Sequence, residues 1–357
     1  DLGPLIFLRQ DFNYSNRGLI SESNLKFEER TVTNAYNYSP RGFLQNSETD
    51  DSESTAYNLN YNFDSMGLMT SESRNGTQTN HTITDTSWQI GSNNYQLDNL
   101  GRVIQKNQKF YTYGENGRIK SVAENATNLA SYYYDEENNP LLKVYPNGDK
   151  ELYFNDLTLI KNDFYEPLKI GARLVGHFKN NTFINSSFDH LSTTLIDEEG
   201  QVNLPLPFGE RDSRTELFKA FDYTSKGYDN EKEAVRMGQR DYDPTAKRFL
   251  TPDNYFLENA DEIQRSPVEN SSYGYAKGDP ISNFDSGGNL AQESGMGHSD
   301  LFRQTQTTEY RASAFNSPAA QAYRREAQGN FLKATGAAAA IGVGLSTLPA
   351  YSLVSAS

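Results

Sequence analysis

The residues most able to do chemistry lie in the last third of the chain, where several Asp residues and an Arg fall in one polar stretch. Residues 240–253 read RDYDPTAKRFLTPD, and residues 285–288 read DSGG. Two Asp side chains brought close together cannot both ionise cheaply, so one keeps a proton while the other stays a base. Such a pair can activate water and protonate a leaving amine, as in aspartic proteases. An isolated Asp before Pro, or in an Asp-Ser-Gly context, is more often a turn former that bonds the local backbone. Both interpretations stay open from these residues alone.

Composition excludes several other kinds of site. The chain has 357 residues, a formal net charge of -14 and no Cys. A nucleic-acid site needs a basic face, so we expect no nucleic-acid partner. The lack of Cys excludes disulfides, Cys-ligated zinc and thiol catalysis. The four His residues are far apart in sequence, so we expect no metal site and no cofactor; they are His81, His177, His190 and His298.

The elements that must position these residues are predicted by an internal repeat. An aromatic residue, any residue, a second aromatic, a short polar turn, Gly and an apolar pair recur in register. The repeats occupy residues 12–20 (FNYSNRGLI), 36–44 (YNYSPRGFL), 61–69 (YNFDSMGLM), 95–104 (YQLDNLGRVI) and 111–119 (YTYGENGRI), with a degenerate copy from residue 132. Alternating aromatics place two rings on one strand face, and Gly adopts the positive φ of a tight turn. Each unit is therefore a predicted β-hairpin, and the hairpins must stack because one alone is marginal.

These repeats resemble YD repeats, whose common form is YxYDxxGRL, and three later stretches strengthen the resemblance. Residues 188–200 are similar to the DHLGSTRLVTDxxG segment of bacterial Rhs (rearrangement hotspot) cores, 206–210 to the YxPFGE segment and 223–229 to FTGKEYD. Residues 240–253 resemble the RYYDPxxGRFxSPDP junction of Rhs proteins and of the C component of Tc toxins. The resemblance implies a mainly β fold, a spiral of YD-repeat hairpins that forms a hollow shell. It also implies three parts: a YD-repeat shell over residues 1–187, a core-associated domain with the junction over 188–290, and a C-terminal cargo or toxin-leading segment over 291–357.

In that family the junction is a self-cleaving aspartyl protease. Carried over by position, the resemblance implies that Asp253 and Asp285 form a catalytic dyad and that Arg240 orders it. The cleavage site expected is the bond between Leu290 and Ala291, with the bond after Gly288 as the next candidate. The sequence departs from the family here, because residues 285–290 read DSGGNL where the family has DPxGL, and residues 258–268 are inserted between the two aspartates.

Beyond residue 290 the composition changes. Residues 314–333 have helix-favouring composition, whereas residues 334–357 carry no charge. The uncharged stretch is just long enough to cross a bilayer, so membrane contact of 334–357 competes with packing inside the shell.

The function expected from the resemblance is a toxin shell of the Rhs type that encapsulates its own C-terminal segment and releases it by intramolecular cleavage. The implied partners are that segment, a secretion-system spike or Tc-type pore components, and an immunity protein. The implied location is outside the producing cell or inside a target cell, and the chain, which starts at Asp1 without Met or signal peptide, is expected to be a piece of a longer protein. The alternatives are a non-enzymatic surface or adhesion scaffold with an inactive junction and a carbohydrate-binding repeat array.

Overall fold

The computed structural model describes residues 8–65, 67–154, 157–171, 173–184, 186–253, 272–285, 287–288 and 292–293. The largest sheet within these ranges has 19 strands. Each strand of this sheet pairs antiparallel with the next strand in the chain, so the sheet is a continuous series of hairpins. The predicted mainly β fold built from YD-repeat hairpins is confirmed.

The strands of the large sheet are β1 (Leu8–Tyr14), β2 (Ile20–Phe27), β3 (Arg30–Tyr38), β4 (Leu44–Asp51), β5 (Tyr57–Phe63), β6 (Met69–Arg74), β7 (Thr77–Ile83), β8 (Ser87–Ile90), β9 (Asn93–Leu97), β10 (Val103–Lys106), β11 (Lys109–Tyr113), β12 (Ile119–Glu124), β13 (Thr127–Tyr134), β14 (Pro140–Val144), β15 (Lys150–Phe154), β16 (Leu157–Ile160), β17 (Asp163–Ile170), β18 (Arg173–Lys179) and β19 (Thr182–Ile184).

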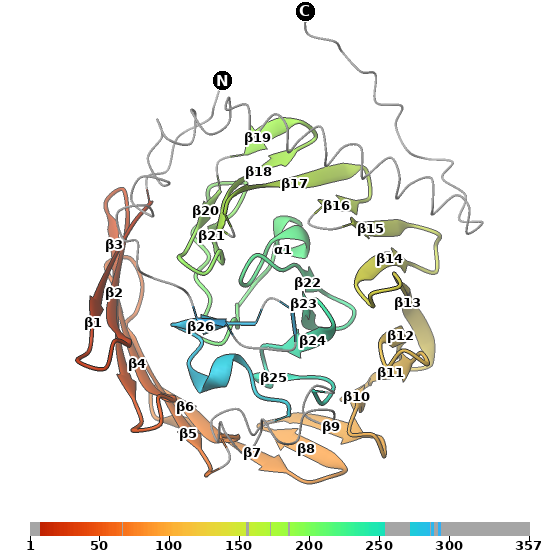
Figure 1. The fold of residues 1–357 in the computed structure, drawn as a ribbon, viewed down its shortest axis with the longest axis horizontal. Coiled ribbons are helices and arrows are strands. Elements are labelled where there is room, and N and C mark those ends of the chain that lie inside the picture. Colours follow the sequence, from red (N-terminus) through yellow and green to blue (C-terminus); the bar gives the residue numbers. More distant parts are fainter. Residues whose placement is uncertain are drawn as a thin grey trace, which may run out of the picture.

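The sheet curls around the remaining described residues, which we call the inner segment (residues 186–253 and 272–285) (Figure 1). Its elements are β20 (Ser187–Phe188), β21 (Thr194–Ile196), α1 (Leu217–Ala220), β22 (Tyr228–Asp229), β23 (Ala234–Met237), β24 (Arg240–Asp243), β25 (Arg248–Phe249), the 3₁₀ turn η2 (Ala276–Gly278) and β26 (Asn283–Phe284). The last strand described, β27 (Gln292–Glu293), pairs with β26. The space enclosed by these strands is therefore filled in part by the chain itself.

In most copies the turn of the repeat is stabilised by the side chain at the Asp position of the YD pattern; the copy at 111–119, with Gly114 there, is an exception. The carboxylate of Asp98 accepts the backbone N–H of Arg102 at 2.9 Å, and that of Asp64 accepts the N–H of Leu68 at 2.9 Å. The hydroxyl of Ser39 accepts the N–H of Phe43 in the same way at 3.1 Å. Ser can therefore replace Asp in this sequence because both offer an oxygen to the N–H four residues later.

The two aromatics of the repeat have different partners. The first ring is buried in four of the copies, as for Tyr111 at 3% exposure, and in three copies the second ring is a Tyr that donates its hydroxyl hydrogen to a carbonyl of the preceding hairpin. Tyr113 donates to the carbonyl of Val103 at 2.7 Å, Tyr134 to that of Ile119 at 2.8 Å, and Tyr38 to that of Ile20 at 2.8 Å. Each acceptor lies two residues after the turn Gly of its repeat. The repeat pattern thus encodes a contact between neighbouring hairpins.

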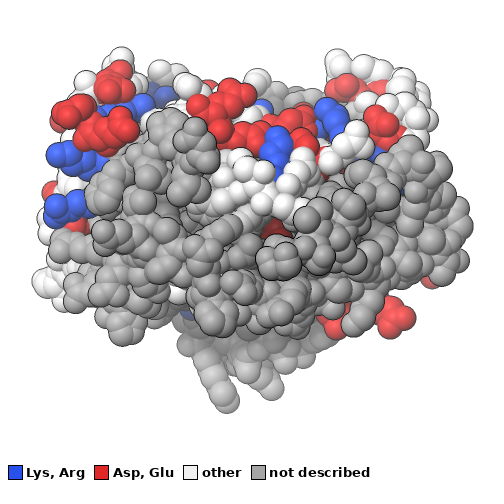
Figure 2. Space-filling view, turned by 90° about the horizontal axis from the view of Figure 1, so that it is seen from above, with Lys and Arg blue, Asp and Glu red and all other residues white. Residues whose placement is uncertain are grey.

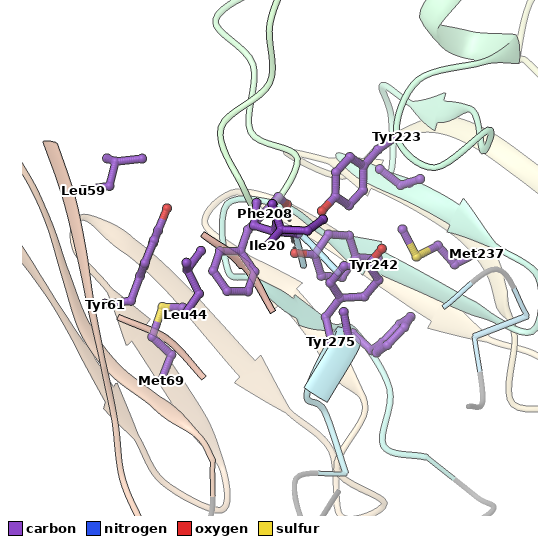
Figure 3. Close-up of a cluster of buried hydrophobic side chains, with 14 residues drawn as sticks. Ile20, Leu44, Leu59, Tyr61, Met69, Phe208, Tyr223, Met237, Tyr242 and Tyr275 are labelled. Carbon is purple, nitrogen blue, oxygen red and sulfur yellow. Dashed lines mark hydrogen bonds between the residues drawn. The ribbon is translucent and has the colours of Figure 1, made fainter. Parts of the chain in front are cut away.

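The inner segment shares its hydrophobic core with the sheet. Figure 3 shows side chains of the sheet facing side chains of the inner segment, and both sets belong to one buried cluster. The sheet contributes Ile20, Leu44, Leu59, Tyr61 and Met69, and the inner segment contributes Phe208, Tyr223, Met237, Tyr242 and Tyr275. The rings of Tyr61 and Phe208 meet edge to face with centroids 5.1 Å apart. The two parts therefore stabilise one another.

Buried ion pairs join the same two parts. Lys143 of β14 is fully buried and lies 3.1 Å from Asp229, with Glu231 and Glu151 also in contact. Lys106 of β10 lies 2.8 Å from Asp243 in the inner segment. Burial lowers the pKa of a Lys, but the neighbouring carboxylates reverse this and raise the pKa of Lys143 and Lys106 above the usual value. Both amines are therefore charged and paired at neutral pH.

The remaining predictions concern parts of the chain that the structure does not describe. Among the described residues, no helix is long and apolar enough to cross a membrane. The uncharged stretch 334–357, for which membrane contact and packing inside the shell were both left open, lies outside the described residues, as do the predicted helical stretch 314–333 and the inserted residues 258–268. On the face shown in Figure 2, acidic and basic side chains are intermixed over the described surface.

Candidate junction site

Arg240 begins β24, in the middle of the small four-stranded sheet of the inner segment. The turn before it contains Gly238, which has a φ of +55°. A side chain does not fit at this position, because its Cβ would lie 2.5 Å from the carbonyl oxygen of Gly287. Gln239 donates its backbone N–H to that same oxygen at 2.9 Å. The turn therefore packs directly against the segment that follows Asp285.

The structure brings the three residues of the predicted junction into one buried cluster. Nη2 of Arg240 lies 2.9 Å from Oδ2 of Asp253 and 3.4 Å from Oδ2 of Asp285. Arg240 is 6% exposed, and each Asp is 2% exposed. Both carboxylates thus surround a single nitrogen atom with little access to water.

The electrostatics of the cluster depend on the charge of Arg240. Burial lowers the pKa of this guanidinium, and the carboxylates of Asp253 and Asp285 oppose that shift. The guanidinium carbon also lies 3.6 Å from the ring centroid of Phe249, a cation–π contact. Arg is suited to this place because its guanidinium stays charged where a Lys would more readily lose its proton.

The chain after Asp285 folds back onto Arg240. Oδ1 of Asp285 accepts the N–H of Gly288 at 2.7 Å, and Nε of Arg240 donates to the carbonyl oxygen of Gly288. The pairing of β26 with β27 connects the two sides of this segment, since Phe284 faces Gln292 and Asn283 faces Glu293. The predicted cleavage residues Leu290 and Ala291 lie outside the described residues. The structure therefore shows the start of the segment at the cluster but not the predicted bond.

Ser272 also belongs to the cluster, which sequence reasoning did not find. Its carbonyl oxygen accepts hydrogen bonds from Nη1 of Arg240 at 3.1 Å and from the N–H of Asp253 at 2.9 Å. No motif marks it, because the contact uses backbone atoms. Gly238 and Gly288 were detectable in principle, since a Gly beside candidate catalytic residues signals close backbone approach.

The histidines and the possible metal-binding groups provide no second candidate site among the described residues. Within the described ranges, no group of three or more His, Asp or Glu side chains could hold a metal ion. His81, His177 and His190 are buried, at 6%, 0% and 7% exposure. Burial lowers the pKa of each of them. These three histidines are neutral at pH 7 and pack as ordinary interior residues.

Comparisons with known proteins agree with the repeat pattern. Residues 5–156 match the family model of the Teneurin YD-shell. Teneurin-m of Drosophila melanogaster is 23% identical over 201 residues, which are 54% of this chain and 7% of that protein. Salivary gland surface protein 1 of Aedes aegypti is 29% identical over 188 residues, which are 49% of this chain and 5% of that protein. The chain therefore spans only a small part of these relatives.

The most informative structural similarities are to Tc toxins. The Tc holotoxin pore of Photorhabdus luminescens superposes with a TM-score of 0.56 at 15% identity, covering 80% of this chain and 18% of that one. The crystal structure of TcdB2-TccC3 without its hypervariable C-terminal region gives a TM-score of 0.54 at 14% identity, covering 79% of this chain and 18% of that one. At this level of identity the likeness concerns the fold. Residues 5–156 therefore resemble the Teneurin YD-shell, and the curled hairpin sheet is similar in fold to solved structures of Tc toxins.

Proposed function

We propose that the chain is part of a toxin shell that encloses its own C-terminal segment and separates that segment from itself by intramolecular aspartyl proteolysis. The observation that carries the proposal is the buried cluster in which Arg240 contacts both Asp253 and Asp285. An aspartic protease needs two carboxylates near one another and near the peptide to be cut. The covalent chain supplies the substrate, so the reaction is effectively unimolecular and needs no separate binding pocket.

The roles of the two carboxylates follow from their contacts. Asp253 makes the shorter ion pair with Arg240, at 2.9 Å, and we assign it the role of taking a proton from water. Asp285 lies farther from the guanidinium, at 3.4 Å, and is placed to give a proton to the leaving amine.

The enclosed cargo, the partners and the place of action belong to the same proposal. The three-part division at residues 187 and 290 follows from it, with residues 291–357 as cargo or toxin-leading segment. Tc-type pore components are the proposed assembly partners, because the structures that share this fold include a Tc holotoxin pore. A secretion-system spike and an immunity protein are the partners of the Rhs form of the proposal, and delivery outside the producing cell or into a target cell follows from either form.

A second function is favoured by the sequence matches to Teneurin-m and to a salivary gland surface protein. In this alternative the chain is a non-enzymatic surface or adhesion scaffold, and the Arg240 cluster is a structural ion network. Buried ion networks of this kind elsewhere in the chain, such as that around Lys143, show that the fold uses them for packing. A carbohydrate-binding array would be a variant of this alternative.

Denaturing intact mass of the purified full chain distinguishes the two. The protease proposal expects two fragments whose masses sum to that of the full chain plus one water. The scaffold alternative expects a single full-length mass. Denaturation is essential because a cut segment that stays inside the shell would not separate under native conditions.

A further inference from the structure

We propose that a cavity between the sheet and the inner segment is a binding site for a neutral oligosaccharide. This cavity, which we call the loop cavity, has a volume of about 800 Å³ and lies between the ends of β3–β6 and the loop of residues 197–215. Ligand sites in proteins have volumes of about 300–1,000 Å³. Arg240, Asp253 and Asp285 are not among the described residues that line the loop cavity. The inference is therefore independent of the cleavage proposal, and it gives the carbohydrate-binding alternative a defined site.

The wall formed by the inner segment is fixed by buried ion pairs. Nε of Arg211 lies 2.5 Å from Oδ1 of Asp222, and Nε of Arg214 lies 2.7 Å from Oδ2 of the same residue. Asp222 is fully buried. Arg211 also donates to the carbonyl oxygen of Thr194, which connects the loop to β21. The wall is therefore formed before a ligand arrives, which lowers the cost of ordering it on binding.

The charges of the loop cavity are nearly balanced and mostly paired. Its lining includes four Arg and five Asp or Glu residues. Arg30 contacts both carboxylate oxygens of Asp51, through Nε at 3.0 Å and Nη2 at 2.6 Å. Arg211 and Arg214 share the carboxylate of Asp222. A strongly charged ligand would meet little net charge of the opposite sign, and an apolar ligand would bury polar groups without partners, which is costly. The lining therefore favours a ligand that is uncharged but rich in polar groups.

The groups available to a ligand include both donors and acceptors. Oδ1 of Asn75 accepts the backbone N–H of Asn58 at 2.8 Å, so Nδ2 of Asn75 can donate to a ligand. The carboxylate of Asp212 is exposed and can accept. The exposed hydroxyl groups of the lining belong to Ser54, Thr55, Ser213 and Thr245. Each sugar hydroxyl both donates and accepts hydrogen bonds, so a row of them matches this mixed lining, whereas a ligand with only donors or only acceptors does not.

Arg74 is the lining residue best suited to recognise a sugar. Its guanidinium carbon lies 5.2 Å from the ring centroid of Tyr57. Of the four arginines in the lining, Arg74 is the one that is exposed and forms no ion pair with a described residue. A stacked guanidinium is held in one orientation and presents its N–H groups as a fork. Such a fork can donate to two oxygen atoms at once, and adjacent hydroxyls of a sugar ring supply two oxygens at a suitable spacing.

Isothermal titration calorimetry of the full chain with neutral tetrasaccharides tests the inference. The probes are cellotetraose, chitotetraose, maltotetraose and mannotetraose, each in low and in high salt. We expect at least one of them to bind with one site per chain and with the same affinity in both salts, because an uncharged ligand is not subject to ionic screening. No binding by any of the four would overturn the inference, as would binding that disappears in high salt.

Two substitutions test whether the bound sugar lies in the loop cavity. Arg74→Ala and Asp212→Ala change exposed side chains, so both variants should fold as the wild type does, which far-UV circular dichroism verifies. Each should weaken binding about tenfold or more, the effect of losing a hydrogen bond to a charged group. Arg9→Ala is the matched control, since Arg9 is an exposed arginine that does not line the cavity, and it should bind with wild-type affinity. Unchanged affinity in either cavity variant would overturn the assignment.

Denaturing intact mass of the same preparations keeps this result apart from the cleavage proposal. Arg74→Ala should be cut to the same extent as the wild type, because Arg74 is not part of the Arg240 cluster. Sugar binding by a chain that yields no fragments would support the loop cavity and contradict the protease. Fragments from a chain that binds none of the four sugars would do the reverse.

Discussion

Arg240 carries a charge at a place where it is nearly inaccessible to water, and its stability there depends on two neighbours. The guanidinium is balanced by Asp253 and Asp285 and packed against Phe249. Removing one partner of a buried charge network leaves uncompensated charge, which costs more than the intact pairing contributes. The cluster is therefore sensitive to single substitutions whatever its chemical role.

Arg240→Gln should destabilise the chain by about 3–5 kcal/mol, because two buried carboxylates lose their countercharge. Chemical denaturation followed by circular dichroism measures the difference in unfolding free energy. Arg9→Gln is the matched control, since the pair of Arg9 with Asp11 is exposed and such pairs contribute roughly 0–1 kcal/mol. Equal effects of the two substitutions would contradict the described burial of the cluster.

The buried imidazole of His177 gives a prediction about pH. Burial, and then the charge of Lys179, lower the pKa of His177 to about 3. Between that value and the ordinary value of about 6.5, the unfolded chain binds a proton that the folded chain does not. The stability that the neutral His177 imidazole contributes is therefore fully present above about pH 6.5 and is lost as the pH falls towards 3. In this window His177→Gln should show a shallower loss of stability, by about 1.4 kcal/mol per pH unit. Unfolding free energies measured from pH 7 to pH 4 check this, and parallel pH curves for the two proteins would show the assignment to be wrong.

At the scale of elements, three hairpins are bonded to the one before them through the second aromatic of the repeat. Tyr113 donates to the carbonyl of Val103, and the guanidinium of Arg102 lies over the Tyr113 ring at 4.5 Å. Arg118 lies over Tyr134 in the same relation, at 4.8 Å. The Gly-Arg of one repeat and the second Tyr of the next thus form one contact, which explains why these residues recur together.

Tyr113→Phe should cost about 1–3 kcal/mol of stability, because the buried Val103 carbonyl loses its hydrogen-bond donor. Tyr133→Phe is the matched control, since Tyr133 points outward and is 50% exposed, and it should change stability by less than about 0.5 kcal/mol. Thermal and chemical unfolding measure both. A control effect as large as that of Tyr113→Phe would contradict the inner and outer assignment of the two rings.

The sequence predicted the hairpins better than the contacts that they make with distant parts of the chain. The recurrence of aromatic, turn and Gly is local information, so the hairpins from Phe12 onward could be predicted without a structure. The filled interior could not, because it depends on pairs far apart in the chain, such as Lys143 with Asp229. The grouping of Arg240, Asp253 and Asp285 was predicted only through a family resemblance. The contact of Arg240 with Gly288 uses a backbone carbonyl, which no residue type reveals.

At the scale of the molecule, the sheet and the inner segment share apolar cores and buried ion pairs, so they should unfold together. Lys143→Met tests this, because it leaves Asp229, Glu231 and Glu151 without the amine that they surround. We expect a loss of about 3–5 kcal/mol and a single transition at lower denaturant. Tyrosine fluorescence and circular dichroism should report the same midpoint. Separate transitions for the two signals would show that sheet and inner segment are independent.

The central claim is that the Arg240 cluster is a protease acting on its own chain, and denaturing intact mass of four full-length proteins tests it most directly. The proteins are the wild type, Asp253→Asn, Asp285→Asn and the control Asp279→Asn, which alters an Asp that is also 2% exposed but bonds the backbone of Ile281 and Ser282. The account predicts two fragments for the wild type and for Asp279→Asn, and an uncut chain for the two dyad variants. Uncut chain in all four proteins, or fragments that persist in either dyad variant, would contradict it.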